Sequence, residues 1–300
     1  MNMNMNSNPV IDSHCHLGRM EHWNEELLDG WFGTFGLPNE TADIDPDKVI
    51  ENMDAAGVDK TAVLAFDCKR HLGVHIPNNY VAEQVRKYDG RLFGFASVDP
   101  LDRSGPAELK RAVEKLGLVG LKVAPTYQNA DPSDPRAMAV FQAASDLGIP
   151  VLIHQGWTGN IEAVSTLQDV ASLEAVLSAF PELRMIVAHV GMPANRECLH
   201  LLAKYEHAYA DLAARDLDSF GGGVRTIYSD IADAVDLGVE HKIFWGTDNP
   251  WRVPKESLEA LDTVNEWAVG GRAPIGDDVL LRIKGQNMAD MMAGLGRDLF

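Results

Sequence analysis

The sequence predicts an α/β fold, a TIM (β/α)8 barrel. Eight short apolar segments alternate with helical segments along the 300 residues, and strands that are apolar throughout are typical of a parallel sheet covered on both faces. A chain of this length suits one barrel. A doubly wound open sheet is the alternative, but no G-x-G-x-x-G motif follows the first predicted strand, which removes the best indication of that fold.

The first predicted strand, PVIDSHCH (9–16), begins apolar and ends in two histidines. The residues before it, MNMNMNSN (1–8), offer nothing to pack, so we expect a frayed lead-in and then a single domain over residues 9–300. The irregular segment 20–45 carries four large aromatic residues among glycines and acids: Trp23, Trp31, Phe32 and Phe35. Such a loop is either a lid over a site or a segment packed on the barrel rim.

After that loop, helices and strands alternate regularly. The helical segment 45–57 ends in Gly57, a residue suited to a helix end, and leads to the strand KTAVLAF (60–66). Six further units and helices at the C-terminus complete the pattern. Their helical segments are 78–90, 105–117, 133–148, 167–181, 193–205 and 224–237, and their strands are 91–98, 118–124, 149–154, 183–189, 207–213 and 241–248.

Composition excludes several classes of protein. The net charge is −18, and with no basic patch the chain is not expected to bind nucleic acid. No apolar run is long enough to span a membrane, and the first residues lack the basic and apolar regions of a signal peptide, so we expect a cytoplasmic protein. Cys15, Cys68 and Cys198 are scattered without metal-type spacing, which argues against a disulfide framework.

The motif IDSHCHLG (11–18) places His14 and His16 on one face of a strand, because residues two apart point to the same side. Asp12 shares that face. Two neutral imidazoles side by side make half of a metal site. A polar strand end is the alternative interpretation of a single H-x-H motif.

Functional groups of such barrels lie at the carboxyl ends of the strands, and those ends carry an unusual set of residues. Several imidazoles and one carboxylate at the mouth of one barrel suit Zn²⁺, Mn²⁺ or Fe²⁺. The sequence therefore predicts a metal site. The strand-end residues are His14, His16, Lys122, His154, His189 and Asp248.

Four strand-end motifs, IDSHCHLG, VLIHQG, IVAHVG and FWGTDNPW, resemble those of the amidohydrolase superfamily. They are most similar to its amidohydrolase-related branch, which includes aminocarboxymuconate semialdehyde decarboxylase-like enzymes. The resemblance extends from Val10 to the terminal IKGQNMADMM. It implies that His14, His16, His154 and Asp248 are the metal ligands and that His189 is the acid–base residue. A homodimer is typical of the branch, so the resemblance implies a candidate dimer.

The fourth strand departs from the binuclear members, which carry a carboxylated lysine or a glutamate at its end. Here it reads GLKVAP, with Lys122 two residues before the end. We therefore expect one divalent ion per chain, with zinc as the first choice and manganese as the second. Lys122 either forms an internal salt bridge to an acid such as Asp12 or binds a substrate carboxylate.

The first functional hypothesis is a metal-dependent hydrolase of a small carbonyl substrate that bears a carboxylate. A metal-activated water would attack the carbonyl, Asp248 would take its proton, and His189 would hold the oxyanion or protonate the leaving group. The second is non-oxidative decarboxylation of an aromatic or unsaturated acid at the same metal, with Asp248 or His189 protonating the carbon that loses CO₂. A barrel that only binds is less favoured, because the ligand set is complete. A related nuclease is disfavoured by the charge.

Overall fold

Eight parallel strands form one curved sheet, which confirms the predicted barrel. The structure is a computed structural model that describes residues 8–217, 223–268 and 271–299, so most of the expected N-terminal lead-in lies outside the described residues. In spatial order the strands are β1 (Ile11–His16), β2 (Lys60–Leu64), β5 (Leu92–Ser97), β6 (Gly120–Val123), β7 (Val151–Ile153), β8 (Met185–Val187), β9 (Ala208–Asp211) and β10 (Ile243–Phe244).

Backbone hydrogen bonds between β1 and the chain after β10 nearly close the barrel. The amide of Ser13 donates to the carbonyl of Trp245 at 3.1 Å, and that of His16 donates to Asn249 at 2.9 Å. Between them, the amide of Asp248 donates to the carbonyl of His14 at 2.7 Å. This closure places the first histidine motif directly beside the aspartate from the other end of the chain.

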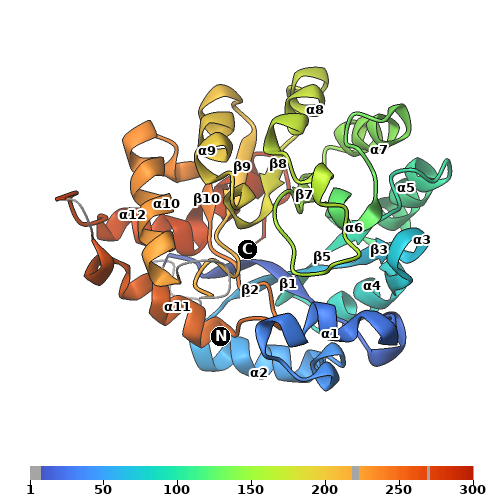
Figure 1. Cartoon of the computed structure of the whole chain (residues 1–300), viewed down its shortest axis with the longest axis horizontal. Coiled ribbons are helices and arrows are strands. Elements are labelled where there is room, and N and C mark those ends of the chain that lie inside the picture. Colours follow the sequence, from blue (N-terminus) through green and yellow to red (C-terminus); the bar gives the residue numbers. More distant parts are fainter. Residues whose placement is uncertain (1–7, 218–222, 269–270, 300) are drawn as a thin grey trace.

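Helices surround the strands, as Figure 1 shows. Helix α2 (Pro46–Ala56) illustrates the local signals: the Asp45 side chain accepts from the amide of Asp47, and Gly57 ends the helix at φ 70°, a left-handed conformation that glycine adopts without strain. The other main helices are α4 (Asn78–Lys87), α5 (Gly105–Leu116), α7 (Pro135–Asp146), α8 (Glu174–Ala179), α9 (Asn195–Lys204), α10 (Val224–Leu237), α11 (Pro254–Asp262), α12 (Asp277–Leu281) and α13 (Asn287–Ala293).

Two apolar clusters support the site. One lies between the strands and the surrounding helices. The other fills the barrel interior with side chains such as Leu64 and Phe95, and three methionines of α13, Met288, Met291 and Met292, pack against it. The side chains at the carboxyl ends of the strands therefore stand on a packed interior. No helix in the described part of the chain is long and apolar enough to cross a membrane.

The structure differs from the sequence prediction in short elements. The predicted strand 60–66 ends at Leu64, and an antiparallel pair of short strands follows, β3 (Phe66–Cys68) and β4 (Val74–Ile76). Each is too short to produce a detectable pattern. The irregular segment 20–45 contains only short helical turns, among them α1 (Leu28–Trp31). The predicted strands 183–189 and 241–248 end early, so His189 and Asp248 lie in the turns beyond β8 and β10.

Candidate metal centre

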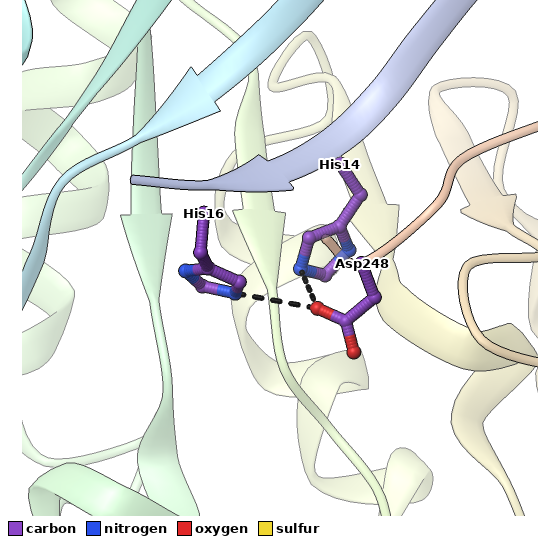
Figure 2. A group of neighbouring side chains, drawn as sticks. All are labelled: His14, His16 and Asp248. Carbon is purple, nitrogen blue, oxygen red and sulfur yellow. Dashed lines mark ion pairs between the residues drawn. The ribbon is translucent and has the colours of Figure 1, made fainter. Parts of the chain in front are cut away.

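Three of the predicted ligands meet at the mouth of the barrel (Figure 2). Nε2 of His14 lies 3.2 Å from Oδ1 of Asp248, and Nε2 of His16 lies 3.3 Å from the same oxygen. All three side chains are buried. The two histidines are alternate residues of β1 and point to the same side, whereas Asp248 comes from the chain after β10, so barrel closure is what assembles the group.

Asp211, at the end of β9, fixes the orientation of His14. Its Oδ2 lies 2.9 Å from Nδ1 of His14, while its Oδ1 accepts from the amides of His189 at 2.8 Å and Ala213 at 3.1 Å. Because a carboxylate accepts, Nδ1 of His14 carries the proton and Nε2 carries the lone pair. The sequence did not predict this contact, because it joins β1 to a strand six places away in the order of the sheet.

The charge states suit a metal. Burial lowers the pKa of His14 and of His16, which keeps both imidazoles neutral. Burial raises the pKa of Asp248, but the neighbouring His14 and His16 imidazoles outweigh it and hold that pKa below its usual value. A lone pair of His14 therefore faces an ionised oxygen at 3.2 Å, an arrangement that a cation stabilises. The donor set, two neutral imidazoles and a carboxylate, fits a divalent ion such as zinc or manganese.

His154 and His189 lie beside this group rather than within it. Nδ1 of His189 donates to the carbonyl of Ala213 at 2.8 Å, so its Nε2 accepts from Nδ1 of His154 at 3.2 Å. That leaves Nε2 of His154 as a buried acceptor with no hydrogen-bond partner among the described residues. Nε2 of His189 also lies 4.0 Å from Oδ2 of Asp248. His189 thus lies beside His154, a predicted metal ligand, and beside Asp248, the predicted base.

Two of these residues adopt an unusual backbone conformation. His189 has φ 56° and Asp248 has φ 57°. Left-handed backbone is uncommon for residues other than glycine, and such strain concentrates at functional sites. The turns aim both side chains back across the mouth of the barrel. Strand periodicity alone could not predict this.

Lys122 lies inside the barrel, as expected from its strand position. It is buried, and its Nζ is 3.1 Å from Nε2 of His14. Burial lowers the pKa of Lys122 to about 8, opposed by the charges of Asp248 and Asp211. Asp12 instead accepts from Oγ1 of Thr247 at 2.6 Å, and no ion pair joins it to Lys122. Of the two predicted roles, the salt bridge to Asp12 is therefore absent.

A cavity lies directly above the metal-ligand group. Its volume is about 550 Å³. The sequence did not predict half of its lining residues, most of which lie in the loops beyond the strand ends. The residues that line it and were not predicted include Phe66, Tyr127, Trp157, Asn160 and Trp251.

Three aromatic residues of the segment 20–45, Trp23, Trp31 and Phe35, line this cavity. The segment is also packed on the apolar core, so both interpretations of it stay open. The ring of Trp31 lies 4.5 Å from that of Tyr127, and Phe32 stacks on Trp251 at 5.6 Å. The indole of Trp251 also donates to the carbonyl of Trp31 at 3.0 Å. The loop after β7 adds a second cover: a Cβ on Gly159 would approach Thr34 to 2.7 Å, so only glycine fits there without movement.

Comparison with known proteins gives a consistent result. The family model described as Amidohydrolase matches residues 11–289. None of the curated proteins matches the chain significantly.

Three solved structures illustrate the likeness in fold. An uncharacterized TIM-barrel protein of Bordetella bronchiseptica is 19% identical with a TM-score of 0.77, over 96% of this chain and 100% of that one. A dihydroxybenzoic acid decarboxylase of Polaromonas sp. JS666, with bound manganese and 2-nitroresorcinol, is 17% identical with a TM-score of 0.69, over 95% and 97%. A probable 2-pyrone-4,6-dicarboxylic acid hydrolase of Acinetobacter baumannii is 15% identical with a TM-score of 0.62, over 95% and 99%.

Proposed function

The chain belongs to the amidohydrolase family and is an enzyme, a hydrolase or a carboxy-lyase, and within that range we propose that it removes CO₂ from a small planar carboxylic acid. The observation that carries this proposal is the aromatic wall of the cavity above the metal-ligand group, which includes Trp31, Tyr127 and Trp251 and fits a flat ring. The sequence favoured hydrolysis, and this aromatic wall is the reason for the different preference here.

We propose that His14, His16 and Asp248 hold one divalent ion, with the unpartnered Nε2 of His154 as a further donor. When bound, such an ion supplies a Lewis acid that anchors and polarises carboxylate or hydroxyl oxygens of a substrate. Zinc and manganese both suit this donor set. The manganese in the Polaromonas decarboxylase supports the second of these.

Lys122 is proposed to bind the substrate carboxylate. Among the described residues that line the cavity it is the single lysine or arginine, and it lies at the metal end, 3.1 Å from Nε2 of His14. Its ammonium can therefore hold a carboxylate near the metal-ligand group by a charge-assisted hydrogen bond.

Asp248 and His189 are proposed to move the proton. Oδ2 of Asp248 and Nε2 of His189 are 4.0 Å apart and both residues line the cavity. One of them takes up a proton from water before the substrate binds and then gives it to the carbon that bears the carboxylate. The bond from that carbon to the carboxylate then breaks, its electron pair returns to the carbon framework, and CO₂ leaves. The aromatic wall of the cavity excludes bulk water from the protonated substrate.

Hydrolysis remains the second candidate because the same Asp248–His189 pair could serve it. Asp248 would take a proton from water and His189 would protonate the leaving group. The likeness to the probable pyrone dicarboxylic acid hydrolase supports this alternative as well.

Isotope labelling separates the two reactions. The metal-loaded protein would be incubated in ¹⁸O-labelled water with hydroxybenzoates, lactones and 2-oxo acids. We expect CO₂ release from an aromatic acid, with no label in the remaining organic product. Label in a product carboxylate, without CO₂, would instead establish hydrolysis. The His16→Ala variant, treated in the same way, controls for contaminating enzymes and for spontaneous loss of CO₂.

A further inference from the structure

Two buried N–H donors on the cavity wall have no hydrogen-bond partner among the described residues. Nε1 of Trp31 and Nδ2 of Asn160 are both unpaired, although their residues are only 4% exposed. Leaving a buried donor unpaired is unfavourable, so such groups call for an explanation. Both residues line the cavity above the metal-ligand group.

The orientation of the Asn160 amide is set by its neighbours. Its Oδ1 accepts from the amide of Glu162 at 2.9 Å, which assigns the oxygen to that side and leaves Nδ2 as the free donor. The Asn160 amide is also close to the helix that carries Trp31: a Cβ on Gly30, the residue before Trp31, would lie 3.7 Å from Cγ of Asn160. The two donors thus come from adjoining parts of the two loops that cover the cavity.

The cavity wall around this donor pair is mainly aromatic, with Thr158 beside Asn160. Lys122, the single lysine or arginine among the described lining residues, lies at the metal end beside His14. Around the pair stand aromatic rings, including Trp23, Phe66 and Trp251. A second carboxylate placed here would lose its hydration without gaining a counter-charge, which is strongly unfavourable. An uncharged oxygen would instead gain hydrogen bonds.

We propose that Trp31 Nε1 and Asn160 Nδ2 form a specificity subsite that receives one uncharged acceptor oxygen of the substrate. This deepens the proposed function and rests on it for the position of the carboxylate at the metal end. The substrate class that follows is a planar acid with a single carboxylate and a hydroxyl, ether or carbonyl oxygen at its other end. Dicarboxylates are rejected by the same pair.

The subsite can be tested without a carboxylate. Acetophenone has a carbonyl that accepts hydrogen bonds and cannot donate them, and α-methylstyrene is its hydrocarbon isostere. The chain has six tryptophans, so the ¹H–¹⁵N spectrum of the zinc-loaded protein holds a small set of indole signals, and loss of one in Trp31→Phe identifies Trp31. We expect acetophenone to shift that signal and α-methylstyrene to leave it nearly unchanged. Equal shifts with both probes, or none with acetophenone, would overturn the proposal.

Two variants and a control measure the contribution of each donor. Trp31→Phe keeps an aromatic ring, and Asn160→Asp keeps the acceptor for the Glu162 amide. Each should reduce the preference for acetophenone over α-methylstyrene by roughly two- to tenfold, the value of one hydrogen bond. Trp267→Phe replaces an exposed tryptophan that is not among the residues lining the cavity, so the preference should not change. An undiminished preference in both test variants would refute the subsite.

Calorimetry with acids then separates this inference from the proposed function. We expect 3- or 4-hydroxybenzoate to bind the zinc-loaded protein more tightly than isophthalate or terephthalate. Tighter binding of the dicarboxylates would overturn the subsite. If acetophenone binds at Trp31 as expected but no acid binds, the subsite stands and the proposed function fails.

Discussion

Replacement of Asp211 by asparagine should weaken metal binding while leaving the protein folded. Oδ1 of Asp211 accepts from the amides of His189 and Ala213, so the amide oxygen of the variant is held on that side. Its NH₂ group must then face Nδ1 of His14, at the place where Oδ2 now lies 2.9 Å away. Two donors cannot face each other, and the proton of His14 moves to Nε2.

The tautomer change alters the metal site in a specific way. In the metal-free variant, Nε2–H of His14 can donate to Oδ1 of Asp248, 3.2 Å away, while Lys122, whose Nζ is 3.1 Å from the same nitrogen, loses its acceptor there. A metal ion, however, must now displace that proton. Loss of such a supporting contact weakens metal binding by roughly 10- to 100-fold. We expect Asp211→Asn to show a fall of this size in zinc affinity, measured by competition with a chelating dye.

The matched control is Asp230→Asn. Asp230 is an equally buried aspartate that accepts from Asn195 and pairs with Arg215 at 2.9 Å. Its replacement should lower the melting temperature and leave the zinc affinity unchanged. Unchanged zinc affinity in Asp211→Asn would refute the proposed role of Asp211 and with it the assignment of Nε2 of His14 as the metal-facing atom.

Three further outcomes are expected. Elemental analysis should find about one divalent ion per chain, because the described end of β6 carries no glutamate or carboxylated lysine to bridge to a second ion; two tightly held ions would contradict this. The variant His189→Asn should keep its metal and lose activity by roughly 100-fold or more, as expected of an acid–base group, whereas joint loss of metal would identify His189 as a ligand. Lys122→Met should weaken binding of a benzoate probe by roughly tenfold or more, the value of a hydrogen bond to a charged group; a fall in stability without weaker binding would assign Lys122 an internal role alone.

Much of the fold could be predicted from the sequence because buried parallel strands carry a strong signal. All eight barrel strands fall within the predicted segments, although β10 is reduced to two residues, Ile243–Phe244. The barrel is closed by hydrogen bonds between β1 and the residues that follow β10. Such pairing depends on the curvature of the whole sheet and leaves no local pattern in the sequence.

The site was predictable to a similar degree. His14, His16 and Asp248 could be brought together because a barrel collects its strand ends at one mouth. The contact between Asp211 and His14 could not, since it requires the side-chain directions of β9 and β1 to be known. Part of the cavity wall could not be predicted from the sequence either. Tyr127, Trp157 and Asn160 lie in loops whose paths are set by packing against the segment 20–45.

Anomalous X-ray scattering from crystals of the manganese-loaded protein would locate the ion in the molecule. We predict a single peak per chain, in contact with Nε2 of His14, Nε2 of His16 and a carboxylate oxygen of Asp248, at the floor of the aromatic cavity. A peak away from these three atoms, or a pair of peaks with Lys122 between them, would contradict the proposed metal centre.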